Sequence, residues 1–266
     1  MLVRMPSLGR AIRALSSRVF NYVENNDCYG IEKNGEKAFL DAMCGWYSRQ
    51  GTRQLDLLDI GGNIGDYSKL LRGLCERHAL EGTIHIFEPT RGCFETLHRA
   101  FSRDERIRLN NVGISDSEGP SEIFYDKEKS GLASLYKRKL DHYGIRMGTS
   151  EGISTTTGRK YLADNGLAHV HLVKLDIEGH ELKAMEGFGE YLSADVIDFI
   201  QFEYGGANLD SHTTLLDFFS LLGSKGFEVS KVMRRGLEVR TYKPYMENFY
   251  NANYVAISKR IIGDIR

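Results

Sequence analysis

Three glycines and an asparagine stand between an apolar run and an amphipathic stretch in the segment DIGGNIGDYS. Gly61, Asn63 and Gly65 form the turn, and carboxylates flank it at Asp59 and Asp66. The dinucleotide-binding fingerprint places glycines at the first, third and sixth positions of such a turn. Counted from Gly61, the third position is Asn63 and the sixth is Asp66. The fingerprint is therefore absent, and glycines needed only for tight packing are the alternative interpretation.

The charges beside this turn indicate which ligand it suits. Two carboxylates repel a diphosphate and attract a cation. S-adenosylmethionine (SAM) has cationic sulfonium and amino groups, and its own carboxylate can lie against the free N–H groups at the start of a helix. The next expected strand ends at Glu88 in HIFEP, where a carboxylate can accept hydrogen bonds from both ribose hydroxyls of a nucleoside. Together these features favour SAM over NAD, although Glu88 alone would be read as a solvated strand end.

A second group of polar residues could carry out chemistry on a ligand held there. KLDIEGHE contains Asp176, Glu178 and His180, and alternation along a strand places the two carboxylates on one side. His180 has the unperturbed pKa best suited to a general base near neutral pH, although it could simply begin a helix. Glu203 ends the apolar run FIQFE, where a charge needs a partner or a function. Asp176 and Glu203 could also hold a divalent cation, but no fuller ligand set accompanies them, so a metal is not favoured.

The elements that must position these residues alternate between strands and helices. Apolar runs rich in Ile, Val, Leu and Phe predict seven strands, and segments of helical period lie between the first five. This alternation predicts an α/β fold with a mostly parallel sheet and helices on both faces. The last two runs can pair antiparallel at an edge of the sheet. The predicted strands are residues 55–60, 83–88, 107–114, 169–177, 196–203, 227–233 and 253–259.

Two segments stand outside this alternation. Residues 115–160 are rich in Ser, Thr, Gly, Lys and Glu, and we interpret them as an insertion above the carboxyl edge of the sheet, where ligands bind in open α/β folds. A surface loop without a function is the alternative. Residues 1–50 are expected to form an N-terminal helical segment that packs on the domain of residues 51–266 or covers its site. A short membrane-surface helix is a second interpretation of its basic, amphipathic start.

The overall composition limits the class of partner. The formal net charge of the 266 residues is -1, so no global field would recruit nucleic acid, and a small molecule is the expected partner. The four cysteines lack C-x-x-C spacing and indicate reduced thiols in a cytoplasmic protein. No apolar run approaches the ~20 residues needed to span a bilayer, so stable membrane insertion is not expected. The oligomeric state stays open.

Several segments together resemble a known family. DIGGNIGDYS, IFEP, NNVGISDSEG and LVKLDIEGHELKAMEGF occur in this order, and with the closing NYVAIS they resemble the FkbM family of SAM-dependent methyltransferases over roughly residues 35 to 259. The resemblance implies the Rossmann-like class I methyltransferase fold, with seven strands and the last antiparallel. Gly62 stands where the family often has Ala, a small-for-small change expected to leave binding undisturbed. The implied SAM contacts are Asp59, Gly61, Asn63, Gly65, Glu88, Asn111, Val112 and Asp176.

The resemblance also implies an activity. Family members are mainly O-methyltransferases of sugars, polyketides and other natural products, so the expected reaction is O-methylation of a small-molecule or saccharide acceptor. Methyl transfer from a sulfonium needs an aligned, dry site, and an alcohol needs a base. Two other hypotheses are a SAM-binding module without catalysis and, less favoured because the fingerprint is absent, a nicotinamide-dependent oxidoreductase. The candidate catalytic residues are Asp176, Glu178, His180 and Glu203.

Overall fold

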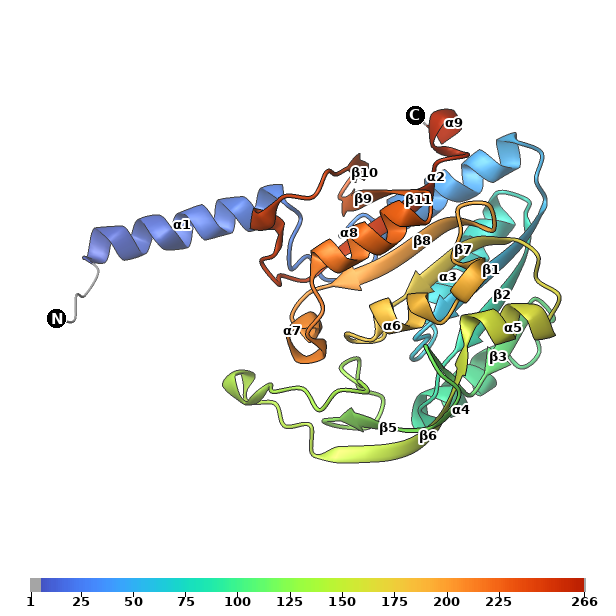
Figure 1. Cartoon of the computed structure of the whole chain (residues 1–266), viewed down its shortest axis with the longest axis horizontal. Coiled ribbons are helices and arrows are strands. Elements are labelled where there is room, and N and C mark those ends of the chain that lie inside the picture. Colours follow the sequence, from blue (N-terminus) through green and yellow to red (C-terminus); the bar gives the residue numbers. More distant parts are fainter. Residues whose placement is uncertain (1–5, 266) are drawn as a thin grey trace.

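Within residues 6–265, which the structure describes, eight strands form one central sheet between two layers of helices (Figure 1). The structure is a computed structural model. Across the sheet the strand order is β10-β9-β11-β8-β7-β1-β2-β3. Its members are β1 (Gln54–Ile60), β2 (Glu81–Phe87), β3 (Ile107–Asn110), β7 (Val170–Leu175), β8 (Ile197–Tyr204), β9 (Phe227–Met233), β10 (Gly236–Val239) and β11 (Ala252–Ser258).

The pairing of the strands confirms the predicted fold class. Neighbours from β3 through β2, β1 and β7 to β8 are parallel, whereas β11 lies antiparallel between β8 and β9. The predicted number of strands is wrong by one. The four-residue strand β10 pairs with β9 and occupies the edge that we expected the last pair to form. Its short segment GLEV has no apolar run that would indicate a strand.

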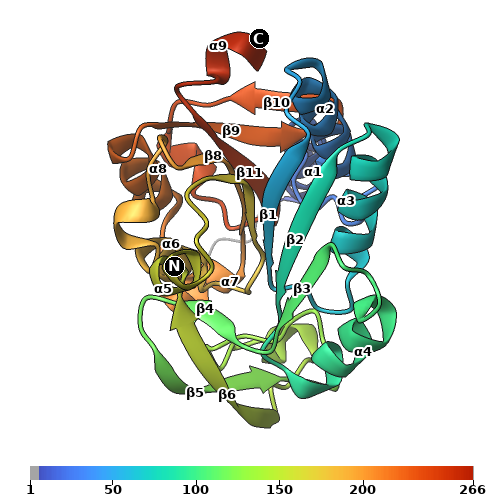
Figure 2. The same cartoon turned by 90° about the vertical axis from the view of Figure 1, so that its right-hand side faces the viewer.

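Helices cover both faces of the sheet, and each layer has its own apolar core (Figure 2). Leu71 and Leu97 belong to one core, and Phe218 belongs to the other. Strand β8 is buried along almost its whole length because both cores cover it. One layer contains α2 (Glu36–Arg49), α3 (Asp66–Arg77) and α4 (Arg91–Phe101), and the other contains α5 (Gly158–Asp164), α6 (Glu181–Glu186) and α8 (Leu215–Ser224). The short elements are α7 (Ala207–Ser211), α9 (Ile262–Ile265), η1 (Asp141–Tyr143), η2 (Gly189–Tyr191) and η3 (Pro244–Met246).

The chain leaves the central sheet after β3. The prediction of one strand over residues 107–114 is wrong, because the chain turns at Asn111 and Val112 and continues as β4 (Gly113–Ser115). In the described part of the chain, β4 joins a second, three-stranded sheet with β5 (Gly119–Tyr125) and β6 (Thr149–Thr157). This small sheet lies beyond one end of the central strands (Figure 2).

Helix α1 (Ser7–Val23) projects away from the rest of the molecule and has no buried residue (Figure 1). The first five residues of the N-terminal segment lie outside the described range. After α1 the chain returns to the body, where the Asp27 amide donates to the Asn251 carbonyl oxygen at 2.8 Å. Helix α2 then packs on the sheet. No helix among residues 6–265 is both long and apolar enough to cross a bilayer.

Candidate functional site

A cavity of about 730 Å³ lies at the carboxyl ends of β1, β2, β7 and β8. Cavities of this size are typical of small-ligand sites. The loop between β5 and β6 contributes one wall, and the loop that follows α1 contributes part of the rim. Residues from the strand ends include Gly61, Glu88, Asp176 and Glu203, whereas the two loops contribute Leu132, Leu135, Arg138, Asp27 and Tyr29.

The glycine turn lies tightly against the neighbouring strand ends. Gly61 and Gly65 have left-handed φ angles of +86° and +90°. A Cβ atom on Gly61 would lie 2.0 Å from the carbonyl oxygen of Asp176, and one on Gly65 would lie 2.6 Å from a phenylalanine ring of α4. A Cβ atom on Gly62 would lie 2.3 Å from Cγ2 of Ile86, so alanine would fit there only if that side chain moved. Glycine is therefore required for packing as well as for backbone conformation.

Glu88 connects the end of β2 to this turn. Its Oε2 accepts a hydrogen bond from the Asn63 amide at 2.9 Å, and its Oε1 accepts from the Thr90 amide at 2.8 Å and the Thr90 hydroxyl at 2.6 Å. Burial raises the pKa of Glu88, and the hydrogen bonds from Thr90 and Asn63 oppose this effect. A carboxylate has about four acceptor positions. One position on Oε2 therefore stays available to a ligand hydroxyl in the cavity.

The residues predicted to contact the cofactor fall into two groups. Gly61, Asn63, Glu88 and Asp176 border the cavity, whereas Asp59, Gly65, Asn111 and Val112 do not line it. The Asn111 side chain donates to the carbonyl oxygen of Glu88 at 2.9 Å and so supports the strand end. Val112 packs against the apolar core.

Asp59 has a different surrounding from the one that we expected. Its side chain is fully buried, accepts a hydrogen bond from Ser68 Oγ at 2.6 Å, and lies 3.2 Å from Lys174 Nζ. Its charge is therefore compensated below the turn. Asp66 is exposed and pairs with Lys69. The negative lining of the cavity must come from other carboxylates.

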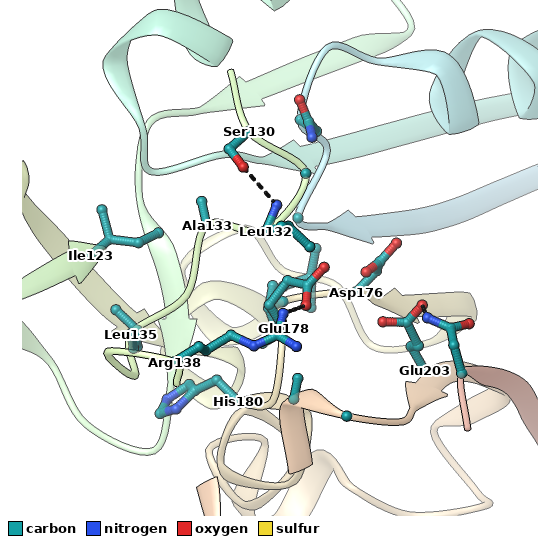
Figure 3. Close-up of a pocket in the computed structure, with 18 of the residues that line it drawn as sticks. Ile123, Ser130, Leu132, Ala133, Leu135, Arg138, Asp176, Glu178, His180 and Glu203 are labelled. Carbon is teal, nitrogen blue, oxygen red and sulfur yellow. Dashed lines mark hydrogen bonds and ion pairs between the residues drawn. The ribbon is translucent and has the colours of Figure 1, made fainter. Parts of the chain in front are cut away.

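Those carboxylates are Asp176, Glu178 and Glu203, which lie on one side of the cavity (Figure 3). One oxygen atom of each lies within 4.8 Å of the others. Burial, reinforced by the charge of Asp176, raises the pKa of Glu178 to about 8. Burial and the charges of Asp176 and Glu178 likewise raise the pKa of Glu203 well above its ordinary value. The charges of neighbouring carboxylates thus disfavour the ionised forms of Glu178 and Glu203.

Neighbouring groups hold each of these carboxylates in place. The guanidinium of Arg138, on the β5–β6 loop, pairs with Glu178 and lies 3.6 Å from Oδ2 of Asp210. The side-chain amide of Asn251 donates to Glu203. Lys174 Nζ lies 3.4 Å from Oδ2 of Asp176, and although burial opposes it, nearby carboxylates raise the pKa of this lysine.

The sequence pattern indicates only one of these supporting contacts. Lys174 stands two positions before Asp176, where β7 ends, and alternation along the chain places the two side chains on one face. Arg138 belongs to an irregular loop, and Asn251 is far from Glu203 along the chain. No local pattern indicates these last two contacts.

His180 borders the cavity, but both of its ring nitrogens are engaged. Nε2 lies 3.0 Å from Ser115 Oγ, and Nδ1 lies 3.1 Å from the Tyr136 hydroxyl. Burial lowers the pKa of His180, which favours the neutral ring. His180 thus connects the start of α6 to β4 and to the β5–β6 loop. Neither nitrogen is available to a ligand while these hydrogen bonds persist.

Among residues 6–265, two groups of side chains have the spacing of metal ligands. In the first, formed by Asp176, Glu178 and Glu203, each member already contacts a protein group described above. The second comprises His169, His171 and Asp198. There His169 pairs with Asp198 at 2.9 Å, and Nδ1 of His171 accepts from the Asp56 amide at 3.0 Å. These contacts occupy atoms that a metal would need.

The chain is similar to several known proteins. The family model for the methyltransferase FkbM domain matches residues 59–229. Methyltransferase sdnD of Sordaria araneosa is 26% identical over 160 residues, which cover 50% of this chain and 60% of that protein. Methyltransferase 1 of Beauveria bassiana (strain ARSEF 2860) is 25% identical over 189 residues, which cover 65% of this chain and 72% of that protein. A Methanococcus jannaschii fibrillarin pre-rRNA processing protein aligns with a TM-score of 0.45 and 11% identity, over 78% of this chain and 68% of that one.

The matched region includes the residues that build the cavity floor. Residues 59–229 contain the glycine turn, Glu88, the segment KLDIEGHE and Glu203. The match extends over more than half of the chain. This protein therefore belongs to the FkbM methyltransferase family.

Proposed function

We propose that this protein is a SAM-dependent O-methyltransferase that acts on a hydroxyl of a small metabolite or saccharide. One observation carries the proposal. The carboxylates of Asp176, Glu178 and Glu203 border the same cavity as the glycine turn and Glu88. The glycine turn with Glu88, which we assign to the nucleoside, and a cluster of proton acceptors thus face one cavity.

The residues at the glycine turn fit SAM. The turn brings backbone close to the cavity without side chains, and Glu88 retains an acceptor position for a ribose hydroxyl. The acidic lining suits a ligand cation. When bound, SAM supplies a methyl group on a positively charged sulfur.

Glu203 is the best-placed general base. It closes β8 at the cavity, and the Asn251 amide orients its carboxylate. Burial and the charges of Asp176 and Glu178 raise its pKa, which makes the ionised carboxylate a stronger proton acceptor than an ordinary one. Asp176 lies beside Lys174. In this scheme Glu203 would accept the proton of the acceptor hydroxyl and Asp176 would supply negative charge, while bound SAM would supply the methyl group and leave as S-adenosylhomocysteine.

The walls suit a small acceptor with both apolar and hydroxylated parts. Leu132 and Leu135 come from the β5–β6 loop, and Tyr29 and Tyr143 border the rim with exposed rings. Aromatic rings at such a rim can stack on the face of a sugar or a planar natural product.

The direct test combines binding and turnover. Purified protein is incubated with methyl-labelled SAM and a panel of sugars and polyphenols, and products are identified by mass spectrometry and NMR. We expect methyl ethers to form. Glu203→Gln is expected to lower kcat by about 10²–10⁴-fold while the Kd for SAM changes less than about threefold. Glu122→Gln, a change in an exposed carboxylate of β5 away from the cavity, is the matched control.

Other outcomes would identify a different function. Binding of NAD in place of SAM would refute the proposal. SAM binding without turnover of any acceptor would favour a binding module without catalysis. Products methylated on nitrogen or carbon would keep the methyltransferase but reject O-methylation. An unchanged kcat in Glu203→Gln would remove Glu203 as the base.

A further inference from the structure

Helix α1 carries an apolar stripe that faces solvent. Its large apolar side chains recur at the spacing of one helix face, and Leu8, Leu15 and Tyr22 are 71%, 64% and 68% exposed. Ile12, Val19 and Val23 lie on the same face and are also exposed. Proteins without a partner seldom expose so many contiguous large apolar residues.

Apart from the contact of Tyr22 with Arg234, the helix is attached to the body through a different flank. Ser17 and Phe20 are partly covered, whereas the residues of the stripe are exposed. Ser17 Oγ lies 3.4 Å from the Tyr250 hydroxyl, and the ring of Phe20 meets the edge of Tyr245. On a helical wheel these two residues stand well away from the stripe. The stripe therefore points outward.

All charged residues of α1 are positive. Arg10, Arg13 and Arg18 are its charged residues, and Ser7–Val23 contains no Asp or Glu. The whole chain has a net charge of -1, so the rest of the molecule is net negative. Arg234, in the β9–β10 turn, lies 4.1 Å above the Tyr22 ring and extends the positive surface toward the body.

The apolar stripe and the positive charges of α1 together distinguish between two possible binding partners, a second copy of the chain and a lipid surface. In a helix pair formed by two copies of the chain, the stripes would pair, but α1 has no acidic residue that could form ion pairs with the arginines of the partner helix. A membrane with anionic lipids provides both an apolar layer for the stripe and negative head groups for the arginines. The charge pattern therefore favours the lipid surface.

We propose that α1 is a peripheral membrane anchor that lies in the plane of an anionic lipid surface. The stripe enters the boundary between head groups and acyl chains, and the arginines remain at the level of the head groups. The loop after α1 contributes Asp27 and Tyr29 to the cavity, so this binding also holds that part of the rim near the lipid.

Tryptophan fluorescence tests the proposal in the full chain. The protein has one tryptophan, Trp46, which is buried in the core and provides a constant background. Leu15→Trp places a reporter in the stripe, and Leu216→Trp places one at an exposed leucine of α8 as the matched control. With phosphatidylcholine vesicles that contain phosphatidylserine, we expect a blue shift for Leu15→Trp alone. Vesicles of phosphatidylcholine are expected to bind far less.

Substitutions then separate the contributions of charge and of apolar contact to vesicle binding. The triple variant Arg10→Gln, Arg13→Gln, Arg18→Gln is expected to lower the partition coefficient on anionic vesicles by about 100-fold, and added salt should weaken wild-type binding. Ile12→Asn with Leu15→Asn keeps the charge and should abolish cosedimentation. Unchanged thermal unfolding would verify that the body remains folded.

Three results would overturn the proposal. The first is a Leu15→Trp spectrum that anionic vesicles leave unchanged, with the protein remaining in the supernatant. The second is equal binding of the wild type and the triple arginine variant. The third is a dimer in light scattering that Ile12→Asn with Leu15→Asn dissociates, without any vesicle binding, because the stripe would then bind a second copy.

Discussion

Glu88→Ala should weaken SAM binding by an amount that follows from the contacts of this carboxylate. Glu88 already accepts three hydrogen bonds from Asn63 and Thr90, which leaves one acceptor position on Oε2 toward the cavity. A hydrogen bond to a charged group contributes about 1.5–3 kcal/mol. The Kd for SAM should therefore rise by about 10- to 150-fold.

Isothermal titration calorimetry with SAM and S-adenosylhomocysteine measures this change. The substitution also removes the acceptor of two backbone amides, which costs about 1–3 kcal/mol for each one left unpaired. Near-UV circular dichroism must therefore verify that the variant is folded at the titration temperature. Thr90→Val is the matched control, because it removes the 2.6 Å hydrogen bond to Glu88 but leaves the Oε2 position intact. Its Kd for SAM is expected to rise less than about fivefold.

A folded Glu88→Ala protein that binds SAM within about twofold of the wild type would refute the assignment. The same would follow if Thr90→Val weakened binding as strongly as Glu88→Ala, since the effect would then come from the strand end as a whole. Glu88→Gln keeps the size of the side chain but loses its charge, and its Kd should fall between those of the wild type and the alanine variant.

Three further predictions concern stability, pH and the role of a histidine. Gly61→Ala should lower the free energy of unfolding by about 2–5 kcal/mol, measured in urea, because its Cβ would lie 2.0 Å from a backbone oxygen at a left-handed φ. A decrease of less than about 0.5 kcal/mol would contradict this packing. Burial raises the pKa of Glu178 from 4.5 to about 8, so the folded state keeps a proton that the unfolded chain releases. This contribution to stability is complete below pH 4.5 and is lost as the pH rises toward 8, and Glu178→Gln should flatten the pH profile of unfolding over that range. His180→Gln should lower stability by about 1–3 kcal/mol but kcat by less than tenfold, because both ring nitrogens bind protein groups; a fall of more than 100-fold would instead identify His180 as the base.

The fold and the position of the turn could be predicted from local patterns. A buried strand covered on both faces must be apolar along its length, as β8 is, and a turn that touches neighbouring backbone must be glycine, as Gly61 is. These requirements act on residues that are close along the chain. For the same reason β10 was missed, because its four residues carry no such pattern.

The amino-acid sequence by itself determined the α/β class and the order in which strands and helices follow one another along the chain. It also determined the glycine turn and the approach of Glu88 to it. Only the tertiary structure decided which carboxylates give the cavity its charge. Asp59 is compensated by Lys174 below the turn, whereas Glu203 faces the cavity beside Asn251. The physical reason is that the energy and pKa of a carboxylate depend on its burial and on charges a few ångströms away. Those neighbours come from distant parts of the chain, and only the fold brings them together.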